Sequence, residues 1–224
     1  MASSSVIKPA DISASRLGFL RETLVSHFGR DDSVRSPFEG LRVLDIGCGG
    51  GLVCEPMSRL GASVTGVDAG DANIKTAMVH AREGGLEIDY RVGTAEGLLA
   101  SGEPPFDVVL NLEVVEHVAD PQQFLSDCAR LVAPGGLMVV ATLNRTAKAW
   151  ALAIVGAEYV LGWLPRGTHE FGKFVTPAEI TAAVTAAGLS ALPPQGVSYD
   201  PLMDAWSLSK DAKVNYMMVA TRTN

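Results

Sequence analysis

The sequence contains few cysteines and no spacing that would pair them. Cys48, Cys54 and Cys128 are an odd number in 224 residues and lack the C-x-x-C pattern of metal sites and redox motifs. The first residues, MASSSVIKPADI, lack the charged and then apolar regions of a secretory leader and the arginine-rich character of a transit peptide. These absences predict a reducing, intracellular compartment.

Basic residues are also scarce, with 18 Lys and Arg against 25 Asp and Glu, for a formal net charge of −7. Nucleic-acid binding needs a positive surface, so the composition argues against a nucleic-acid partner. The longest apolar run, Ala149 to Leu164, contains Glu158 and is shorter than the roughly 20 apolar residues of a membrane-spanning helix. The sequence therefore predicts no transmembrane segment.

Hydrophobic residues, in contrast, make up 47% of the chain, which is enough to bury a sizeable core. The length is typical of one compact unit, and we interpret residues 1–224 as a single domain. A helix is predicted over about residues 11–28, because Leu17, Leu20 and Leu24 recur at helical spacing.

Short apolar segments alternate with helical segments along the rest of the chain. This alternation is typical of βαβ units, which build a doubly wound α/β fold around a mostly parallel sheet. Such folds bind their ligands at the carboxyl ends of the strands. The predicted strands are 41–46, 62–68, 86–92, 106–112, 137–143 and 216–221, and the predicted helices are 52–60, 73–82, 122–132 and 176–187.

The glycine-rich turn after the first predicted strand is the most informative segment. Its sequence, VLDIGCGGG, places Asp45, Gly47 and Gly49 where the backbone can turn tightly and admit a ligand against the chain. Asp68 ends the second strand about 20 residues later, where nucleotide-binding folds place the carboxylate that accepts hydrogen bonds from ribose hydroxyls. A structural turn alone would not require so many glycines, so we predict a nucleoside-type ligand.

The spacing of the glycines indicates which nucleoside. The dinucleotide fingerprint G-x-G-x-x-G requires a glycine where this chain has Leu52. The pattern D-x-G-x-G-x-G instead resembles motif I of class I S-adenosylmethionine-dependent methyltransferases. Further segments are similar to the ubiquinone-biosynthesis O-methyltransferases, namely LEVVEHVADP (112–121), PGG (134–136), ATLNRT (141–146), ALAIVGAEYVLGWLPRGTHEFGKFVTPAEI (151–180) and NYMMVAT (215–221).

This resemblance implies a Rossmann-like class I methyltransferase fold with a seven-stranded sheet. It also implies methyl transfer from S-adenosylmethionine to a phenolic hydroxyl of polyprenylated catechol and demethylubiquinol intermediates, at two steps of ubiquinone biosynthesis. The cofactor contacts that it implies in this chain are Arg16, Gly47, Asp68 and Leu112, and Asp45 and Gly49 belong to the same glycine motif.

A cluster of ionisable residues follows the strand predicted at 106–112. Glu113, Glu116 and His117 have i, i+3, i+4 spacing, which puts them on one face if the segment is helical. The resemblance implies that they bind Mg²⁺, and Mn²⁺ or Zn²⁺ also suits a site with an imidazole. A phenol has a pKa of about 10, so a metal or a base must activate its oxygen. In one alternative, Glu116 or His117 acts as the base without a metal. In another, the two acids only stabilise the N-terminus of a helix through its dipole, and His117 packs against the protein.

An insertion of about residues 145–175 is too apolar for an ordinary surface connection. Its stretch 147–165 carries Trp150, Trp163 and a local basic excess, which are features of a helix at a membrane interface. We predict that it contacts a membrane and presents a lipid-tailed substrate, although a buried helix or a dimer contact would give the same pattern. His169 is a candidate for lining the acceptor pocket. We expect the protein in the cytoplasm, in peripheral contact with the inner membrane. In a eukaryote, the corresponding place is the matrix side of the mitochondrial inner membrane.

Two other functions fit the same predicted cofactor site. One is a small-molecule O- or N-methyltransferase with a different acceptor, against which the segment 151–180 argues. The other is a catalytically silent, cofactor-binding subunit of a biosynthetic complex. Turnover with a demethylated quinol analogue would distinguish the predicted enzyme from the silent subunit.

Overall fold

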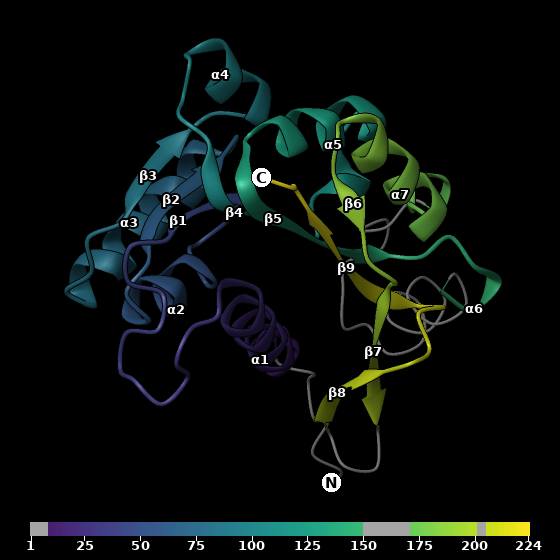
Figure 1. Cartoon of the computed structure of the whole chain (residues 1–224), viewed down its shortest axis with the longest axis horizontal. Helices are drawn as coiled ribbons and strands as arrows, with labels where there is room; N and C mark the ends of the chain where they lie inside the picture. Colours follow the sequence, from purple (N-terminus) through teal and green to yellow (C-terminus); the bar gives the residue numbers. More distant parts are fainter. Residues whose placement is uncertain (1–8, 150–170, 201–204) are drawn as a thin grey trace, which may run out of the picture.

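A single mixed sheet with helices on both faces forms the centre of the protein (Figure 1). The computed structural model describes residues 9–149, 171–200 and 205–224. Five strands run parallel in the order β3-β2-β1-β4-β5, and the sheet continues through antiparallel β9, β7 and β8, with β6 paired to β9. The strands are β1 (Arg42–Ile46), β2 (Ser63–Asp68), β3 (Asp89–Val92), β4 (Phe106–Leu112), β5 (Val132–Leu143), β6 (Ser190–Ala191), β7 (Gln195–Asp200), β8 (Ala205–Ser209) and β9 (Asn215–Thr221).

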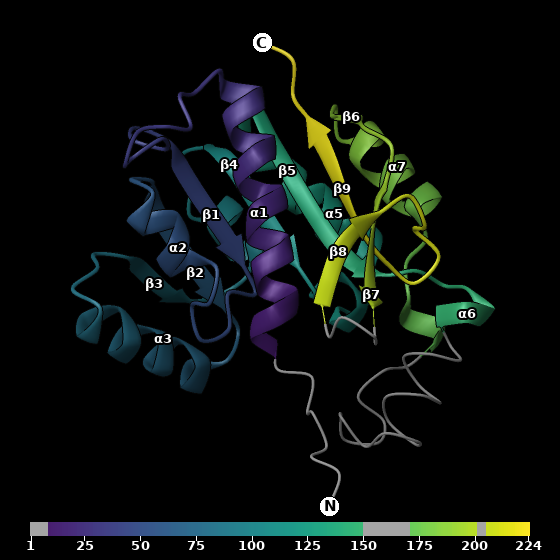
Figure 2. The ribbon, with the colours of Figure 1, turned by 90° about the horizontal axis from the view of Figure 1, so that it is seen from below.

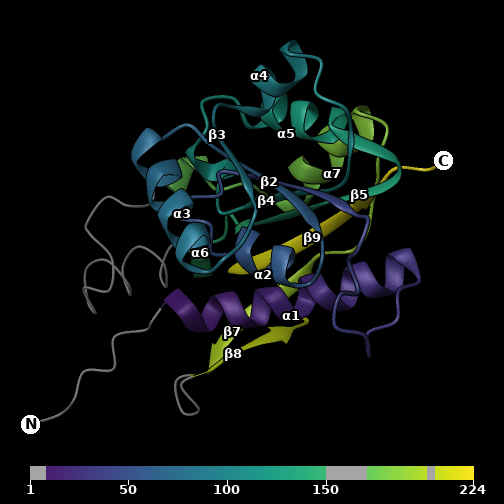
Figure 3. The same ribbon diagram turned by 90° about the vertical axis from the view of Figure 1, so that its left-hand side faces the viewer.

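The helices divide between the two faces of this sheet (Figure 3). Helices α1 (Pro9–Phe28), α2 (Cys54–Arg59) and α3 (Asp71–Glu83) pack on one face, with α1 lying beside β8 (Figure 2). Helices α4, α5 and α7 pack on the other face. The doubly wound α/β fold predicted from the sequence is therefore confirmed. The remaining elements are α4 (Ala95–Ala100), η1 (Val115–His117), α5 (Pro121–Arg130), α6 (Ala147–Ala149), η3 (Phe171–Lys173) and α7 (Pro177–Ala186).

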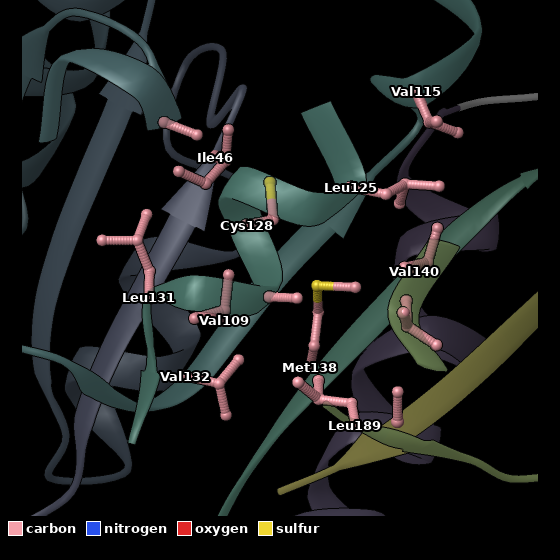
Figure 4. Packing of buried hydrophobic residues seen from close by; sticks show 14 of the residues in the cluster. Ile46, Val109, Val115, Leu125, Cys128, Leu131, Val132, Met138, Val140 and Leu189 are labelled. Carbon is pink, nitrogen blue, oxygen red and sulfur yellow. The ribbon is translucent and has the colours of Figure 1, made fainter. Parts of the chain in front are cut away.

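The core forms two layers because neighbouring residues of a strand point to opposite faces of the sheet. On β4, Val109 packs in the cluster beneath α5, where it lies near Cys128 and Met138 (Figure 4). Leu110 points the other way and packs in the cluster that includes Leu20 of α1. Burial on both sides explains why the central strand β4 is largely apolar in the sequence.

Local capping fixes where the helices near the site begin. The Asp120 side chain accepts a hydrogen bond from the Gln123 backbone N–H at 3.0 Å, and Pro121 occupies the first turn of α5. Thr176 and Glu179 form a reciprocal capping box at the start of α7. These caps hold the two helix N-termini at the same edge of the sheet.

The sheet has nine strands in the described residues, whereas the resemblance implied seven. Strands β7 and β8 form a hairpin in which Val197 is buried. Their sequences, QGVSYD and AWSLS, alternate apolar and polar residues, a short strand signal that the predicted strands do not include. Strand β5 begins at Val132, because the chain passes through the 134–136 PGG segment as part of the strand. The predicted start of that strand at residue 137 was therefore too late.

The topology brings three strand ends together where a ligand is expected. In the parallel registers, Ile46 at the end of β1 pairs with Val67 of β2 and with Asn111 of β4. The turns that follow these three strands are therefore neighbours. They carry the glycine loop, Asp68 and the 113–117 segment.

Candidate cofactor and active site

The glycine loop after β1 is bent back over the end of β2. The backbone N–H groups of Gly47 and Cys48 both donate to the carbonyl oxygen of Val67, at 2.7 and 3.1 Å. Gly47 has φ +73°, and a Cβ atom there would lie 2.3 Å from Cγ2 of Val114 in the turn after β4. Only glycine fits this position, because any side chain would collide with that valine and strain the backbone.

Asp68 ties the loop to the end of β2. Its Oδ2 accepts a hydrogen bond from the Gly49 backbone N–H at 3.0 Å, and its Oδ1 accepts from the Gly70 N–H at 2.7 Å and from Asn73 Nδ2 at 3.0 Å. A Cβ atom at Gly49 would meet no atom within 4 Å. The loop thus presents open backbone beside a fixed carboxylate, which suits a nucleoside whose sugar hydroxyls donate to Asp68.

Asp45 lies beneath the loop, not on its open side. Its side chain is buried, and Oδ2 accepts a hydrogen bond from the Cys54 thiol at 3.3 Å. Burial raises the pKa of Asp45 to about 7, the thiol hydrogen bond opposes this shift, and the charge of Asp68 adds to it. Asp45 is therefore placed to support the loop from inside the protein.

Asp45→Asn is expected to stabilise the protein more at pH 8 than at pH 5. The folded-state pKa of about 7 exceeds the unfolded value of about 3.9, so wild-type stability falls as pH rises from the lower value to the higher one. Asparagine does not titrate and still accepts from Cys54. The gain in free energy of unfolding should be on the order of 2–3 kcal/mol larger at pH 8 than at pH 5. Urea unfolding at both pH values measures it, and equal gains would contradict the prediction.

The turn after β4 brings together two residues that the sequence assigned to different sites. Glu113 has φ +61°, and its backbone N–H donates to the carbonyl oxygen of Ala141 at 2.8 Å. Its carboxylate forms an ion pair with Arg16 of α1. Leu112, the other predicted cofactor contact here, ends β4 directly before this turn and is half-buried.

Glu116 points into the protein toward β5. Its Oε2 accepts a hydrogen bond from Thr142 Oγ1 at 2.8 Å, while its Oε1 is buried without a hydrogen-bond partner. Burial, together with the negative charge of Glu113, raises the pKa of Glu116 well above its usual value.

The prediction that Glu113, Glu116 and His117 share one helical face is wrong. The helical part is a single 3₁₀ turn, Val115–His117, and Glu113 precedes it with a left-handed backbone. Over the ranges that the structure describes, no three His, Cys, Asp or Glu side chains form a group that could hold a metal ion. The three residues therefore do not fit the predicted cation site, and no chemical step is assigned to a metal here.

His117 faces a different space from Glu116. It is exposed and lies on the wall of a cavity of about 660 Å³ between η1, the start of α5 and α7. Hydrophobic side chains and charged side chains of both signs line this cavity. The lining residues are His117, Val118, Ala119, Asp120, Pro121, Gln122, Leu125, Arg145, Gly172, Lys173, Phe174, Val175, Glu179, Ala182 and Ala183.

Sequence reasoning missed two polar residues that the structure places beside the site. Thr142 holds Glu116, and Asn111 near the end of β4 is buried with neither its amide nitrogen nor its amide oxygen hydrogen-bonded. The available signal was a polar residue inside each apolar strand, at FDVVLNL and LMVVATL. Such orphaned buried groups often mark a place where a ligand or water supplies the missing partner.

Part of the predicted acceptor region cannot be compared with the structure. His169 and most of the stretch 147–165 lie outside the described residues, which resume at Phe171. Within the described ranges, every helix is too short or too polar to span a bilayer. The predicted interfacial contact and the role of His169 therefore stay predictions.

The fold agrees with comparisons to known proteins. A family profile described as a methyltransferase domain matches residues 21–193. The magnesium protoporphyrin IX methyltransferase of Synechocystis, solved with bound SAH, superposes with a TM-score of 0.68 at 19% identity, covering 95% of this chain and 84% of that one. An S-adenosylmethionine-dependent methyltransferase of Clostridium acetobutylicum superposes at 0.67 with 12% identity, covering 95% and 92%. Fold and family together define an S-adenosylmethionine-dependent methyltransferase of class I.

Relatives of higher identity give the family within this class. The ubiquinone biosynthesis O-methyltransferase of Maricaulis maris is 68% identical over 92% of this chain and 81% of its own length. The protein of the same name from Parvibaculum lavamentivorans is 61% identical over 93% of this chain and 82% of its own length. The chain belongs to the ubiquinone biosynthesis O-methyltransferase family.

Proposed function

We propose that this protein methylates a phenolic hydroxyl of polyprenylated catechol and demethylubiquinol intermediates, with S-adenosylmethionine as the methyl donor. The observation that carries the proposal is the 68% identity, across 92% of the chain, to a ubiquinone biosynthesis O-methyltransferase. The glycine loop and Asp68 support it by providing an open cradle and a fixed carboxylate of the kind that a nucleoside requires. Methylation of a different small-molecule acceptor and a catalytically silent role remain outcomes of the test.

Each cofactor residue is assigned to one part of the ligand according to the strand end at which it lies. We assign the backbone at Gly47 and Gly49 to the body of the ligand, Asp68 to its sugar hydroxyls and Leu112 to the far wall of the cradle, with Asp45 supporting the loop from below. When bound, S-adenosylmethionine supplies an electrophilic methyl group on a sulfonium. Rate enhancement then comes from holding the acceptor oxygen in line and excluding water, which are tasks of the surrounding side chains.

The acceptor must lose its proton as it reacts, because a neutral phenol is a weak nucleophile. We assign the base to His117, which is exposed on the cavity wall, where a substrate can reach it. Glu116 fits this role less well, because its carboxyl is buried and hydrogen-bonded to Thr142. We therefore propose that Glu116 positions the turn from which His117 projects.

Transfer of a labelled methyl group from S-adenosylmethionine tests this function. The acceptors are catechols and demethylated quinols that carry zero to several isoprene units, and each is assayed with and without EDTA. We expect label in the tailed acceptors, and we expect His117→Ala to lower kcat by about 10²- to 10⁴-fold while the affinity for S-adenosylhomocysteine is unchanged.

The other outcomes are distinct. Label in tailless acceptors alone would indicate another small-molecule methyltransferase. No transfer to any acceptor by protein that binds S-adenosylhomocysteine would indicate the silent subunit. Loss of activity in EDTA that Mg²⁺ restores would support the predicted cation.

The proposal also includes the partners and the location of the protein. We propose that residues 147–165 contact a lipid surface, that the protein associates with a biosynthetic complex, and that it is peripheral at the inner membrane.

A further inference from the structure

The ion pair between Arg16 and Glu113 joins two parts of the chain at the edge of the cofactor cradle. Arg16 comes from α1 and Glu113 from the turn after β4, 97 positions apart in the sequence. The Arg16 side chain is 13% exposed and that of Glu113 is 31% exposed, so the pair is partly buried. Desolvation offsets part of the attraction within such a pair, so its presence is weak evidence for a purely stabilising role.

The backbone of Glu113 is held in an unfavourable conformation. Among the described residues, Glu113 alone of the non-glycine residues has a positive φ, at +61°. A left-handed residue with a side chain costs roughly 1–2 kcal/mol, and such conformations gather at functional sites. The hydrogen bond from the Glu113 N–H to Ala141 and the ion pair with Arg16 hold the turn in this shape.

This turn touches the glycine loop. Val114, the residue after Glu113, is the side chain that a Cβ atom at Gly47 would strike at 2.3 Å. The sheet order β3-β2-β1-β4 places the turn after β4 on the opposite side of β1 from Asp68. A ligand whose sugar lies at Asp68 and whose body crosses the loop therefore directs its other end toward Arg16 and Glu113.

Arg16 retains hydrogen-bonding capacity in this position. Its Nη2 group donates to Glu113 Oε1, but its Nε is buried without any hydrogen-bond partner. A guanidinium has five N–H donors in a fixed plane, so one carboxylate leaves several of them for a second acceptor. The amino-acid end of S-adenosylmethionine carries a carboxylate of matching chemistry.

We infer that Glu113 is a positioning residue, which holds the Arg16 guanidinium at the amino-acid end of S-adenosylmethionine. The inference rests on the cofactor part of the proposed function and is independent of the acceptor. It also accounts for the misfit of the predicted metal site, because the guanidinium already supplies the positive charge beside Glu113. Glu113 thus acts on the cofactor through Arg16.

Two ligands separate this role from a purely structural one. S-adenosylhomocysteine carries the amino-acid end, whereas 5′-methylthioadenosine has the same adenosine and sulfur but lacks the carboxylate. Isothermal titration of both ligands is compared for wild type, Glu113→Gln, Arg16→Ala and the double variant. We expect Arg16→Ala to weaken S-adenosylhomocysteine binding by about 10- to 100-fold and Glu113→Gln by about 10-fold. Both variants should change methylthioadenosine affinity by less than about twofold, and the double variant should resemble Arg16→Ala alone.

Glu103→Gln is the matched control. Glu103 pairs with Arg42 and Arg91, and its side chain is 13% exposed, so the substitution removes a paired carboxylate that is more buried than that of Glu113 and lies away from the cradle. It should leave both affinities unchanged. Glu113→Asp keeps the charge but shortens the side chain, and it should bind S-adenosylhomocysteine with an affinity between those of wild type and Glu113→Gln. If Glu113→Gln does not fold, this variant carries the test.

Three results would overturn the inference. They are unchanged affinity for S-adenosylhomocysteine in Glu113→Gln and Glu113→Asp, equal weakening of both ligands, or additive losses in the double variant. Wild-type protein that binds neither ligand would instead contradict the cofactor assignment itself.

Discussion

Gly47→Ala is expected to abolish measurable binding of S-adenosylhomocysteine, with a loss of affinity of more than about 100-fold. The added Cβ would lie 2.3 Å from Val114 Cγ2, and φ at this position is +73°. Both effects force the loop away from the end of β2, where the Gly47 and Cys48 N–H groups now bond to Val67. Isothermal titration measures the affinity, and circular dichroism verifies that the variant is folded.

Two companion variants isolate the collision as the cause. Gly40→Ala introduces the same methyl group at φ +82°, where nothing lies within 4 Å, so it carries backbone strain without a clash. Its affinity should stay near that of wild type. Val114→Ala combined with Gly47→Ala removes the nearest methyl groups and should restore part of the binding. Wild-type affinity in Gly47→Ala, or loss of the same size in Gly40→Ala, would contradict this explanation.

Asp68→Asn is expected to weaken S-adenosylhomocysteine binding by about 30- to 1,000-fold, equivalent to roughly 2–4 kcal/mol. Both carboxylate oxygens accept backbone hydrogen bonds, from Gly49 on one side and Gly70 on the other. An amide places an N–H group against one of these donors. It also removes the charge that we expect to bind the sugar hydroxyls.

Asp71→Asn is the matched control for this effect. Asp71 is an exposed aspartate in the first turn of α3, and its partner is Lys75 on the same helix. The substitution makes the same chemical change three positions along the chain and should leave affinity within about twofold of wild type. Titration of both variants under one condition tests the comparison. A change of less than threefold in Asp68→Asn would remove this carboxylate from the cofactor site.

The sequence was sufficient to predict the parallel half of the fold and the glycine-rich turn after β1. Strands buried on both faces are continuously apolar, so β1 and β4 are visible as LRVLDI and FDVVLNL. Asp68 is visible as the acidic residue that ends the second predicted strand, about 20 residues after the glycine turn. Hairpin β7–β8 and the short helix α4 lack this signal. The hairpin strands alternate apolar and polar residues and form no continuous apolar run, and α4 contains Gly97 and is only six residues long.

The arrangement of the ionisable cluster, Glu113, Glu116 and His117, could not be predicted. The spacing of residues determines the directions in which their side chains point only within a regular helix or strand. The left-handed backbone at Glu113 interrupts the segment. As a result, Glu113 points to Arg16, Glu116 to β5 and His117 to the cavity. Arg16 is far from Glu113 in the sequence, and their pairing depends on how α1 crosses the sheet.

Strand β9 lies inside the sheet, between β5 and β7, although it is the last strand of the chain. During synthesis at the ribosome, the parallel half emerges first and has an open edge along β5 until residues 215–221 are translated. An unpaired strand edge of this kind can pair with another chain. Pairing of β9 with β5 closes that edge, so the folding of residues 215–221 onto the sheet competes with association between nascent chains.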